Sequence, residues 1–594
     1  MKTEREKREI LQADLCVIGG GMAGVCAAVA AARRGVRVVL LQDRPVLGGN
    51  ASSEIRMWIR GASTSFPQYR EGGIIEELAN DNIFHNPSMN FSLWDAVVYN
   101  KVIAEKNITL LLNTTCIDAE EADGRIVSVT AWQLTSYKFF RVEAAYFADC
   151  SGDCILAEYT GAQCRRGRES RAEYGEAYAP EKADGCTMGN SCLLQARETD
   201  GPVFYTPPPF AYRFSDEEIE SRLNIKKGVD YSVENFWWLE TGGTGDTVRD
   251  AEALNKALIA KAFGAWDYIK NSGRFDSQNW ELDWVGFLAG KRESRRYCGD
   301  YTLTQNDVET AQPFADEVAY GGWTMDDHNP LGIETREPAN IHHPINAPYP
   351  IPYRCLYSKN IENLFFAGRN ISVTHMALSS TRVMATCALV GQAVGTACAV
   401  ALRHKTTPRG VGTYIGELQQ ALRDDDCYLL HTPRKVSAAL RTAETSLPPE
   451  QFQTLLGGTE RKLGNAQNIL EVRLGEACTF VFAKPQTCPY LRIVFDNDIA
   501  GERYGKEERM LAAYPNRCNL PKNAPKARVA PSLVRAYRVE VLKGGEWKPL
   551  FATEKNEARL VKLPVGEEIG GFRFIGEETY GCGTARLFSI DICD

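Results

Sequence analysis

The chain has 594 residues, and because a single hydrophobic core rarely grows beyond roughly 250 to 300 residues, we expect two or three domains. Hydrophobic residues make up 44% and charged residues 24% of the sequence, which is typical of an ordinary globular protein and excludes the fibrous and disordered classes. The 68 Lys and Arg residues against 76 Asp and Glu residues give a net charge of -8, so the sequence predicts a small-molecule substrate and no nucleic-acid partner.

The N-terminal segment MKTEREKREI is charged and lacks the apolar core of a signal peptide, which predicts a cytoplasmic protein. No stretch reaches the roughly 20 uninterrupted apolar residues of a membrane span. The longest candidate, ALVGQAVGTACAVAL, contains Gln392 and is predicted to be a buried helix. The 18 cysteines are scattered and lack the C-x2-C pairs of zinc and iron-sulfur sites, so we expect most of them to be reduced and buried, with no metal site.

A glycine-rich turn follows the first predicted strand. The apolar run ADLCVI predicts a strand over 13–18, GGGMAG follows at 19–24, and the alanine-rich stretch up to Gly35 predicts a helix. In this setting Gly19 permits a tight turn, Gly21 lets the backbone approach a pyrophosphate, and Gly24 allows close helix packing. The order of strand, turn and helix predicts nucleotide binding at Gly19, Gly21, Met22, Ala23 and Gly24.

The next predicted strand, VRVVLLQ, ends on Gln42, where nucleotide-binding proteins of this kind usually carry an acid. A carboxylate at this place accepts hydrogen bonds from a ribose diol. Gln42 keeps a carbonyl acceptor and adds an NH2 donor without the charge, so the ribose contact is expected to survive in a weaker form. Asp43 is a second candidate for the contact, although strand alternation can point it elsewhere.

A second glycine pair follows closely, in the loop RPVLGGNASS. Two glycines allow the backbone to lie against an extended ligand, while short polar side chains hydrogen-bond to it. The loop resembles the one that holds the FAD pyrophosphate and ribityl chain in glutathione-reductase-type flavoproteins. The cofactor contacts predicted in this loop are Arg44, Gly48, Gly49, Asn50, Ser52 and Ser53.

Three later segments strengthen this resemblance. Residues 145–162, AYFADCSGDCILAEYTGA, are similar to the strand and turn that carry an ATG-type motif in such flavoproteins, and residues 289–296, AGKRESRR, form a dense charge run. Residues 363–402, which begin NLFFAGRNISVTH, resemble the closing FAD motif. Together, over roughly residues 10 to 430, these segments resemble the FAD-dependent oxidoreductase family that includes tricarballylate-dehydrogenase-like and heterodisulfide-reductase-A-like proteins. The cysteine-rich iron-sulfur signatures of those relatives are absent.

The resemblance implies FAD as the cofactor and a closing helix that begins near Thr381. The positive N-terminal end of that helix is expected to face the flavin pyrimidine and to stabilise negative charge on the reduced ring. Arg369 and Arg382 contact the cofactor on this interpretation; the alternative is that each is an ordinary ion-paired arginine. The contacts implied for these segments are Cys116, Cys150, Ser151, Gly152, Gly368, Arg369, Thr381, Arg382 and Val383.

His375 is the predicted proton-transfer residue, because an unperturbed histidine titrates near neutrality and the resemblance places it beside the isoalloxazine ring. The alternative is a structural histidine that caps the following helix. The adjacent His342 and His343 are candidates for substrate contacts and form a poor metal motif.

The charge run supplies two further catalytic candidates, Arg292 and Arg295. Arginines can form bidentate contacts to a substrate carboxylate or to the FAD phosphates. In the alternative interpretation, Glu293 pairs with the neighbouring arginines on a helix face.

The predicted fold class is α/β, a Rossmann-like FAD-binding domain with an inserted α+β substrate domain and a C-terminal all-β sandwich. The expected bounds are 1–164 and 355–432 for the FAD-binding domain, 165–354 for the substrate domain and 433–594 for the sandwich. Six of the ten tryptophans fall in the insert, where they fill a core or stack on a sugar. Short alternating strands from NILEVRL onward predict the sandwich, which resembles discoidin-like and carbohydrate-binding-module-type jelly rolls.

These features predict an FAD-dependent oxidoreductase that transfers a hydride between flavin N5 and a small polar metabolite, with carbohydrate-derived compounds as candidates. One alternative is a flavin-dependent reductase of an enone-type acceptor, and another is a glycan-binding or scaffold protein with non-catalytic FAD. The expected partner is a small-molecule substrate, and neither nucleic acid nor a membrane is expected. The sequence leaves both a monomer and a homo-oligomer as alternatives.

Overall fold

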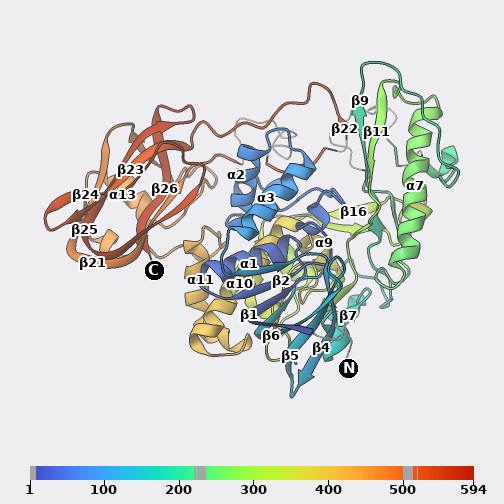
Figure 1. Cartoon of the computed structure of the whole chain (residues 1–594), viewed down its shortest axis with the longest axis horizontal. Coiled ribbons are helices and arrows are strands. Elements are labelled where there is room, and N and C mark those ends of the chain that lie inside the picture. Colours follow the sequence, from blue (N-terminus) through green and yellow to red (C-terminus); the bar gives the residue numbers. More distant parts are fainter. Residues whose placement is uncertain (1–7, 220–221, 224–235, 500–512, 518, 594) are drawn as a thin grey trace.

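The computed structural model describes residues 8–219, 222–223, 236–499, 513–517 and 519–593. The charged segment at positions 1–7, which belongs to the prediction of a cytoplasmic protein, lies outside the described residues. Figure 1 shows a central sheet with helices, a part on the right that carries the long helix α7, and an all-β region on the left, coloured orange and red.

A seven-stranded sheet forms the centre, with its strands in the order β3-β2-β1-β6-β5-β4 and β18 against β6. Strands β1, β2, β3, β6 and β18 pair in parallel. Every residue of β2 and β18 is buried, as expected for a parallel sheet that is covered on both faces. The strands are β1 Arg8–Ile18, β2 Val38–Leu41, β3 Ile108–Leu111, β4 Thr114–Ala122, β5 Arg125–Gln133, β6 Lys138–Asp149 and β18 Leu364–Phe366.

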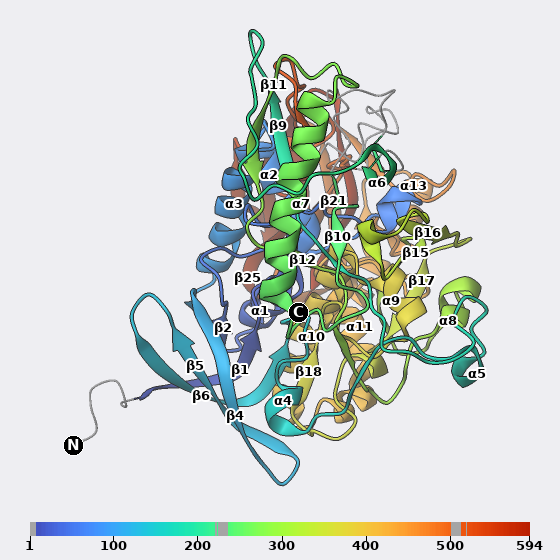
Figure 2. The ribbon, with the colours of Figure 1, turned by 90° about the vertical axis from the view of Figure 1, so that its right-hand side faces the viewer.

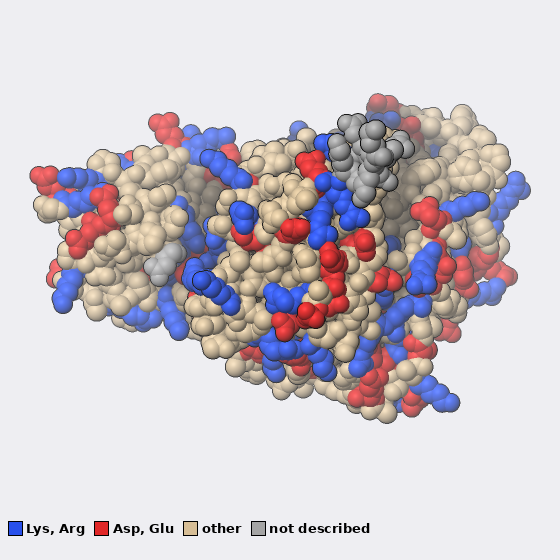
Figure 3. All heavy atoms as spheres, turned by 60° about the horizontal axis from the view of Figure 1, so that its bottom comes forward, with Lys and Arg blue, Asp and Glu red and all other residues tan. Residues whose placement is uncertain are grey.

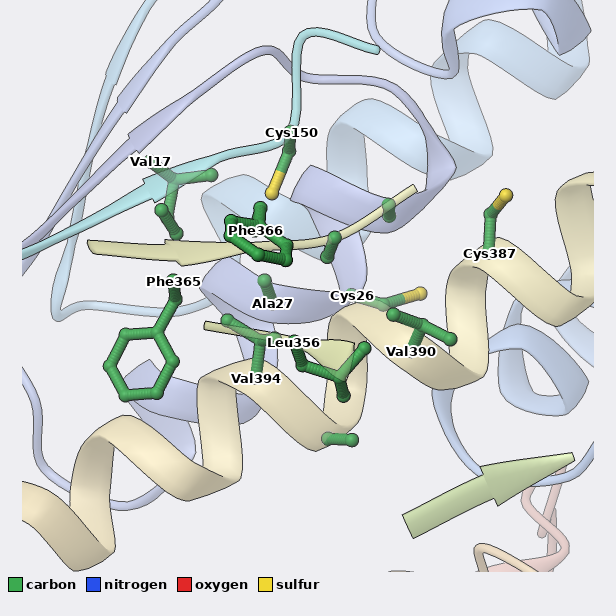
Figure 4. Packing of buried hydrophobic residues seen from close by; sticks show 14 of the residues in the cluster. Val17, Cys26, Ala27, Cys150, Leu356, Phe365, Phe366, Cys387, Val390 and Val394 are labelled. Carbon is green, nitrogen blue, oxygen red and sulfur yellow. The ribbon is translucent and has the colours of Figure 1, made fainter. Parts of the chain in front are cut away.

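Two apolar helices, α1 (Met22–Arg33) and α10 (Met384–His404), pack against each other beside this sheet. Gly391 and Gly395 make the contact possible, because a Cβ on either would lie within 2.1 Å of a backbone carbonyl oxygen of α1. Figure 4 shows the buried side chains of this core, Ala27 of α1 among them. The other helices of this part are α2 Ile74–His85, α3 Phe91–Ile103, α4 Ala157–Thr160, α9 His375–Thr381 and α11 Ile415–Asp424.

Helix α10 contains the apolar stretch that the sequence assigns to a buried helix. Among the described residues it is the one helix long and apolar enough to cross a membrane, and 94% of its most apolar window is buried inside the protein. The buried-helix prediction is confirmed. The described cysteines are free and most are buried, and no group of His, Cys, Asp and Glu in the described ranges could hold a metal ion.

The insert forms a part of mixed structure beside the helix α7, as Figure 2 shows. Its strands form the three-stranded sheet β10-β8-β12 and the pairs β11–β9, β13–β7, β14–β17 and β15–β16, and β22 (Asn519–Leu520) of the C-terminal part adds a third strand beside β9. Trp238 and Trp266 lie in a separate hydrophobic core of this part. The elements are β7 Cys164–Arg166, α5 Arg171–Tyr174, β8 Asn190–Ser191, β9 Leu194–Glu198, α6 Asp216–Ile219, β10 Glu240–Thr241, α7 Ala251–Asn271, β11 Trp280–Val285, β12 Gly290–Lys291, β13 Arg295–Tyr297, α8 Gln305–Thr310, β14 Glu317–Gly321, β15 Met325–His328, β16 Asn340–His343 and β17 Tyr349–Pro352.

The C-terminal part is an antiparallel all-β region with its own hydrophobic core. Its strands follow the order β20-β26-β21-β25-β23-β24, with β19 against β21. The elements are α12 Ala438–Arg441, β19 Glu444–Thr445, α13 Pro449–Leu456, β20 Leu470–Arg473, β21 Ala477–Phe495, β22 Asn519–Leu520, β23 Val534–Lys543, β24 Glu546–Thr553, β25 Leu560–Thr579 and β26 Thr584–Cys593.

A strand pairing and a set of buried ion pairs are two of the contacts that join this β region to the rest of the protein. Strand β22 leaves it and pairs in parallel with β9 of the insert. Buried ion pairs form the second junction, where Arg559 contacts Asp426 at 2.6 Å and lies 3.5 Å from Glu76 of α2. The expected domain bounds stay a prediction, and the pairing of β22 with β9 shows that the segment after 433 is not self-contained.

Charged side chains of both signs are interleaved on the molecular face shown in Figure 3, without a large field of one sign. This surface agrees with the balanced composition and the small negative net charge.

Candidate functional site

A cavity of about 630 Å³ extends from the turn after β1 to the start of α10. Most of the predicted cofactor residues meet at its wall although they come from six separate stretches of the chain. The predicted residues that line it are Gly19, Gly21, Met22, Ala23, Gln42, Asp43, Arg44, Gly48, Gly49, Asn50, Cys116, Cys150, Ser151, Gly152, Arg292, Gly368, Arg369, Arg382 and Val383.

The glycine turn after β1 has the geometry that a nucleotide-binding turn needs. Gly19 has φ of +101°, a conformation that L-residues with side chains rarely adopt, and a Cβ on Gly24 would lie 1.8 Å from the carbonyl oxygen of Gly19. Gly24 therefore fixes helix packing and does not line the cavity. Gly21 faces the cavity as the N-cap of α1, which has no side-chain cap, so the first N–H groups of this helix are available to an anion.

The side-chain amide of Gln42 makes two hydrogen bonds to backbone groups, so it is not available for the expected contact with a ribose. Its Oε1 accepts from the N–H of Gly20 at 2.7 Å and its Nε2 donates to the carbonyl of Val46 at 2.9 Å. The side chain is 2% exposed and joins the glycine turn to the loop that follows β2. Asp43 also lines the cavity and has a largely exposed side chain, so it is the better placed of the two for a ribose.

We expect Gln42→Glu to lower the free energy of unfolding by about 1–3 kcal/mol, because a carboxylate has no N–H for the Val46 carbonyl and would place a charge on a side chain that is 2% exposed. The measurement is urea denaturation of the protein without FAD. Asp43→Asn at the neighbouring exposed position is the control and should change stability by less than about 0.5 kcal/mol. A Gln42→Glu protein that unfolds at the same urea concentration as the wild type would contradict the stabilising hydrogen bond from the Gln42 amide to Val46.

The second glycine pair forms part of the cavity wall, as predicted, but its two serines do not. Gly48 and Gly49 have positive φ values of 99° and 60°, and the N–H of Gly48 donates to the carbonyl of Gly20 at 2.9 Å. Ser52 is fully buried behind the loop and Ser53 donates its backbone N–H to Asp95, so neither reaches the cavity. Neither serine is among the residues that line the cavity, and their contact with the cofactor stays a prediction.

Asp153 connects the turn after β6 to the insert. Its carboxylate accepts from Lys291 at 2.7 Å and from Arg369 at 2.9 Å. Burial opposes ionisation, but the two cations outweigh it and hold the pKa of Asp153 well below its usual range. The absence of a side chain at Gly152 leaves room for Arg369, because a Cβ on Gly152 would lie 2.5 Å from the guanidinium carbon. Lys291 and Arg369 thus place two positive charges on the cavity wall.

The closing helix begins later than the sequence predicts. His375–Thr381 forms the short helix α9, and α10 starts at Met384 after a break at Arg382 and Val383. Thr381 is buried in the last turn of α9 and does not line the cavity, whereas Val383, Met384 and Cys387 do. The helix end that faces the cavity therefore belongs to α10, and the predicted start near Thr381 is corrected by three residues.

A polar cluster stands on the insert side of the cavity, and of its members the sequence predicted only Arg292, Arg382 and His342 as contacts of substrate or cofactor. Strand β10 carries Glu240, which lies 3.3 Å from Arg292 and 2.7 Å from Nδ1 of His328. Nε2 of His328 lies 3.2 Å from Asp326, and Arg382 contacts the same carboxylate at 3.1 Å. Despite burial, His328 and Arg382 hold the pKa of Asp326 far below its usual range.

The short strands β15 and β16 explain why these residues share a face. Side chains alternate along a strand, so Asp326 and His328 point to one side, and their partners in the register are His342 and Asn340. All four line the cavity, and His343 on the other face stacks on Tyr178 at 3.8 Å. Polar residues at every second position of DDH and NIHH are the signal that could have identified this cluster. Two tryptophans, Trp237 and Trp323, complete the wall.

His375 does not line the cavity and lies beneath it, 1% exposed. Nδ1 is 2.9 Å from Glu293 and Nε2 is 3.0 Å from Asp327. Burial lowers the pKa of this ring, but the two carboxylates outweigh burial and raise it to about 10. This enclosed imidazole lies between two carboxylates and does not line the cavity, so the geometry does not favour His375 as the catalytic base, and that role stays a prediction.

Residues 291–296 form no helix, so the alternative is wrong about a helix face, but it is right that Glu293 pairs with a neighbouring arginine, Arg296. Arg295 pairs with Glu158 away from the cavity, which contradicts its predicted contact with substrate or phosphate. Glu293 pairs with Arg296 and His375 in the buried interior. Of the predicted catalytic residues, only Arg292 reaches the cavity, where it is held by Ser191 and Glu240.

The residues of the cavity wall fit an extended, acceptor-rich dinucleotide such as FAD. A Cβ on Gly21 would meet only Gly49 within 4 Å, so the space above the first turn of α1 is open. Four buried N–H groups on cavity-lining side chains have no hydrogen-bond partner among the described residues: Trp58 Nε1, Trp323 Nε1, Arg369 Nε and Arg382 Nε. All are donors, and the phosphate, hydroxyl and carbonyl oxygens of FAD are acceptors. The two glycine-rich loops, the N-terminus of α1 and the positive charges on the cavity wall agree with the FAD that the sequence implies.

Comparisons with known proteins give one family and several distant structures. A comparison with curated protein sequences gives no match. One similar solved structure is a geranylgeranyl bacteriochlorophyll reductase-like protein from Thermoplasma acidophilum, with 10% identity and a TM-score of 0.31, covering 70% of this chain and 86% of that chain. Another is a myxobacterial chondrochloren halogenase, with 12% identity and a TM-score of 0.34, covering 70% of this chain and 80% of that chain. A family 32 carbohydrate-binding module from Streptococcus pneumoniae EndoD is similar over 26% of this chain and 94% of that chain, with 14% identity and a TM-score of 0.18. The sequence profile described as FAD dependent oxidoreductase matches residues 14–422, more than half of the sequence, and the chain therefore belongs to the FAD-dependent oxidoreductase family.

Proposed function

We propose that this FAD-dependent enzyme transfers a hydride between the flavin and a hydroxyl-bearing carbon of a small polar metabolite, and that the metabolite is carbohydrate-derived. The supporting observation is the wall near α10, where two tryptophans stand beside a dense set of polar groups. Aromatic rings stack on the apolar faces of sugars, and carboxylate, amide and guanidinium groups bind their hydroxyls. Trp237, Trp323, Asp326, Asn340 and Arg382 supply these groups here.

FAD, when bound, supplies the acceptor or donor for the hydride. The residues of the chain supply orientation and charge. Arg292 and Arg382 line the cavity, and guanidinium donors at such a place stabilise negative charge as it develops on a substrate oxygen. Asp326 accepts hydrogen bonds from a second hydroxyl and fixes the ring of the substrate.

A second candidate is reduction of an enone-type acceptor, and the donor character of the same cluster favours it. Guanidinium groups next to a carbonyl oxygen polarise it toward an enolate in the direction of reduction, just as they stabilise an alkoxide in the direction of oxidation. The proposal of a glycan-binding or scaffold protein has less support, because a family of enzymes and a cavity with charged groups favour turnover.

For the C-terminal β region we propose a structural role. The buried contacts of Arg559 with Asp426 and Glu76 hold it against α2 and the segment after α11, and β22 extends it to the insert. Its resemblance to carbohydrate-binding modules is a likeness of sequence pattern and is not needed for this role.

Anaerobic mixing of the purified protein with aldoses, polyols, uronates and 2-hydroxy acids tests the proposal, because a substrate bleaches the visible absorbance of the flavin. The chemically reduced protein is mixed in parallel with cyclic enones, and return of the absorbance identifies the second candidate. If the flavin responds to neither group, both proposals fall.

Trp323→Ala is expected to raise the KM for the bleaching compound about tenfold, which corresponds to a lost stacking contact of about 1.4 kcal/mol. The flavin content should stay at the wild-type level. Trp132→Ala is the matched control, because Trp132 stacks with Phe139 of the central sheet and does not line the cavity. An unchanged KM for Trp323→Ala would remove this tryptophan from the substrate contacts.

A further inference from the structure

The carboxylate of Glu71, just before helix α2, lies behind the cavity wall. Glu71 is 5% exposed and does not line the cavity. Its Oε1 accepts a hydrogen bond from the backbone N–H of Ala62 at 2.7 Å and one from the hydroxyl of Thr386 at 3.3 Å. Both carboxylate oxygens also lie against Gly61, where a Cβ would be 2.2 and 2.4 Å from them. Glu71 therefore joins two segments that are distant in the sequence.

Both of these segments border the cofactor cavity. Arg60 lines the cavity on the first segment, and Met384 and Cys387 of α10 line it on the second. A further hydrogen bond connects the two segments, because the N–H of Ala385 donates to the carbonyl of Arg60 at 3.0 Å. The carboxylate of Glu71 thus stands at a junction that shapes one end of the cavity.

The first turn of α10 separates Glu71 from the cavity. Met384 and Cys387 are three positions apart, so they lie on one face of the helix, and this face borders the cavity. Thr386 does not line the cavity, and its hydroxyl reaches Glu71 on the other side of the turn. A helix with its side chains is about 10 Å wide, so the carboxylate stands roughly 10 Å from the cavity. A charge at this distance still acts across the protein interior.

The charge of Glu71 opposes the positive end of α10. The N-terminal end of a helix carries about half an elementary positive charge, and a carboxylate beside it cancels part of that field. The resemblance to flavoproteins implies that this helix end faces the flavin pyrimidine, which gains negative charge on reduction. An ionised Glu71 therefore makes reduction of the flavin harder, whereas a protonated Glu71 leaves the field of the helix intact.

The pKa of Glu71 lies close to neutral pH. Burial raises this pKa to about 6, although the hydrogen bonds from Ala62 and Thr386 and the positive charge of Arg461 act in the opposite direction. The carboxyl group therefore holds its proton at pH 5 for most of the time and is ionised at pH 8.

The other titratable groups around Glu71 keep their charge over this range. Burial lowers the pKa of Arg60 only to about 10 and raises the pKa of Cys387 to about 12. Arg70 and Glu76, on the same segment as Glu71, pair with each other at 2.7 Å. Three buried phenols interact with the charge of Glu71, and burial raises the pKa of each far above neutrality: Tyr320, Tyr349 and Tyr514. A change of charge between pH 5 and pH 8 is therefore expected at Glu71.

We propose that Glu71 is a positioning residue for the flavin end of the cavity, which ties the segment of Arg60 to α10 and whose charge sets how readily the flavin is reduced. The inference goes beyond the proposed function and does not depend on the identity of the substrate. A hydride brings two electrons and one proton to the flavin, and near pH 6 a second proton passes from solvent to Glu71. By reciprocity, reduction strengthens the binding of this proton by the same factor by which the proton favours reduction.

The reduction potential of the bound flavin tests this assignment without any substrate. Anaerobic titration with dithionite and a reference dye gives the potential of the wild type and of Glu71→Gln. Glutamine keeps an oxygen acceptor for the N–H of Ala62 and removes the charge. At pH 8 the equilibrium constant for reduction of the variant is expected to be about tenfold larger, which corresponds to about 30 mV for two electrons. At pH 5 the two potentials should agree.

Glu317→Gln is the matched control. The carboxylate of Glu317 is also buried, burial raises its pKa, and it accepts from the backbone N–H of His431 and the hydroxyl of Thr432, both at 2.8 Å. None of these three residues lines the cavity, so the potential should match the wild type at both pH values. Equal potentials of Glu71→Gln and the wild type at pH 8 would overturn the assignment, and so would an equal shift in Glu317→Gln.

Thr386→Val provides a second test, which stands even if Glu71→Gln does not fold. The hydroxyl of Thr386 lowers the pKa of Glu71, so its loss lets Glu71 keep the proton to a higher pH. The potential of this variant should exceed that of the wild type at pH 7 and equal it at pH 5 and pH 9. An unchanged potential at pH 7 would contradict the role of Glu71. A search for substrates that finds none would refute the proposed function and leave these potentials unaffected.

Discussion

His375→Gln is expected to lower the free energy of unfolding by about 3–5 kcal/mol, although the ring is remote from the substrate wall. The imidazolium lies between the carboxylates of Glu293 and Asp327, and all three groups are largely buried. Removal of one partner of a buried ion pair leaves an uncompensated charge in a medium that solvates it poorly. Glutamine can donate one hydrogen bond but brings no positive charge.

The same cation gives the wild-type protein a pH dependence that the variant must lack. An ordinary histidine has a pKa of about 6.5, and the carboxylates raise the pKa of His375 to about 10 in spite of burial. A raised pKa in the folded state means that the contribution to stability is complete below about pH 6.5 and is lost as the pH rises through about 10. The wild-type free energy of unfolding should therefore fall between these values, and the slope should be smaller in His375→Gln.

Urea denaturation at pH 6, 8 and 10 is the measurement, with His343→Gln as the control because that ring stacks on Tyr178 near the surface. The free energy of unfolding should change with pH by the same amount in His343→Gln and in the wild type. A His375→Gln protein that unfolds within about 1 kcal/mol of the wild type at pH 6 would contradict the buried ion pair.

The backbone part of the cofactor site was predictable, because it follows from local rules. Gly19, Gly21 and the second glycine pair stand where a turn or a close approach excludes side chains, and such constraints leave their mark on the sequence itself. The parallel strands β1 and β2 and the helix α1 were equally visible, since their apolar runs match a buried sheet with a helix on its face.

The polar side of the site was not predictable, because pairing between distant segments determines it. Asp326 and Asp327 are neighbours in the sequence, yet strand alternation directs one to the cavity and the other to His375. Whether His375 is a base or a fixed cation depends on Glu293, which is 82 positions away. In the same way, Gln42 matched the pattern of a ribose-binding residue, but the nearby Val46 carbonyl and the Gly20 N–H occupy its amide.

The start of the closing helix shows a limit of another kind. The sequence predicts one closing helix that begins near Thr381, whereas the chain forms α9 up to Thr381, breaks at Arg382 and Val383, and starts α10 at Met384. The break is favoured by a tertiary contact, because the guanidinium of Arg382 turns to Asp326 on the insert. A position in the sequence cannot reveal such a partner before the fold is known.

Gly21→Val is expected to weaken FAD binding at least about 100-fold while the fold persists. Gly21 has φ of -67°, which a side chain tolerates, and an added Cβ would meet only Gly49 at 3.9 Å. The methyl groups then occupy the space at the N-terminus of α1 where a pyrophosphate binds. A steric cost of about 3 kcal/mol corresponds to about a 100-fold loss of affinity.

Gly24→Ala separates this effect from a general loss of stability. Its Cβ would lie 1.8 Å from the carbonyl oxygen of Gly19 and points away from the cavity, so the turn and α1 must move apart. We expect this variant to unfold more easily with or without FAD, by about 1–3 kcal/mol. Gly21→Val without FAD should instead unfold at the same urea concentration as the wild type without FAD.

The measurements are the flavin absorbance of the purified proteins and the shift in Tm on addition of FAD. A ligand that binds only the folded state raises Tm by an amount that follows its affinity, so the shift should be large for the wild type and nearly absent for Gly21→Val. If Gly21→Val is purified with a full complement of flavin, the cofactor does not pass over the first turn of α1. The position of every other group in the cavity relative to the flavin would then have to be assigned again, because Gly49, Arg369 and Val383 line the same cavity as that turn.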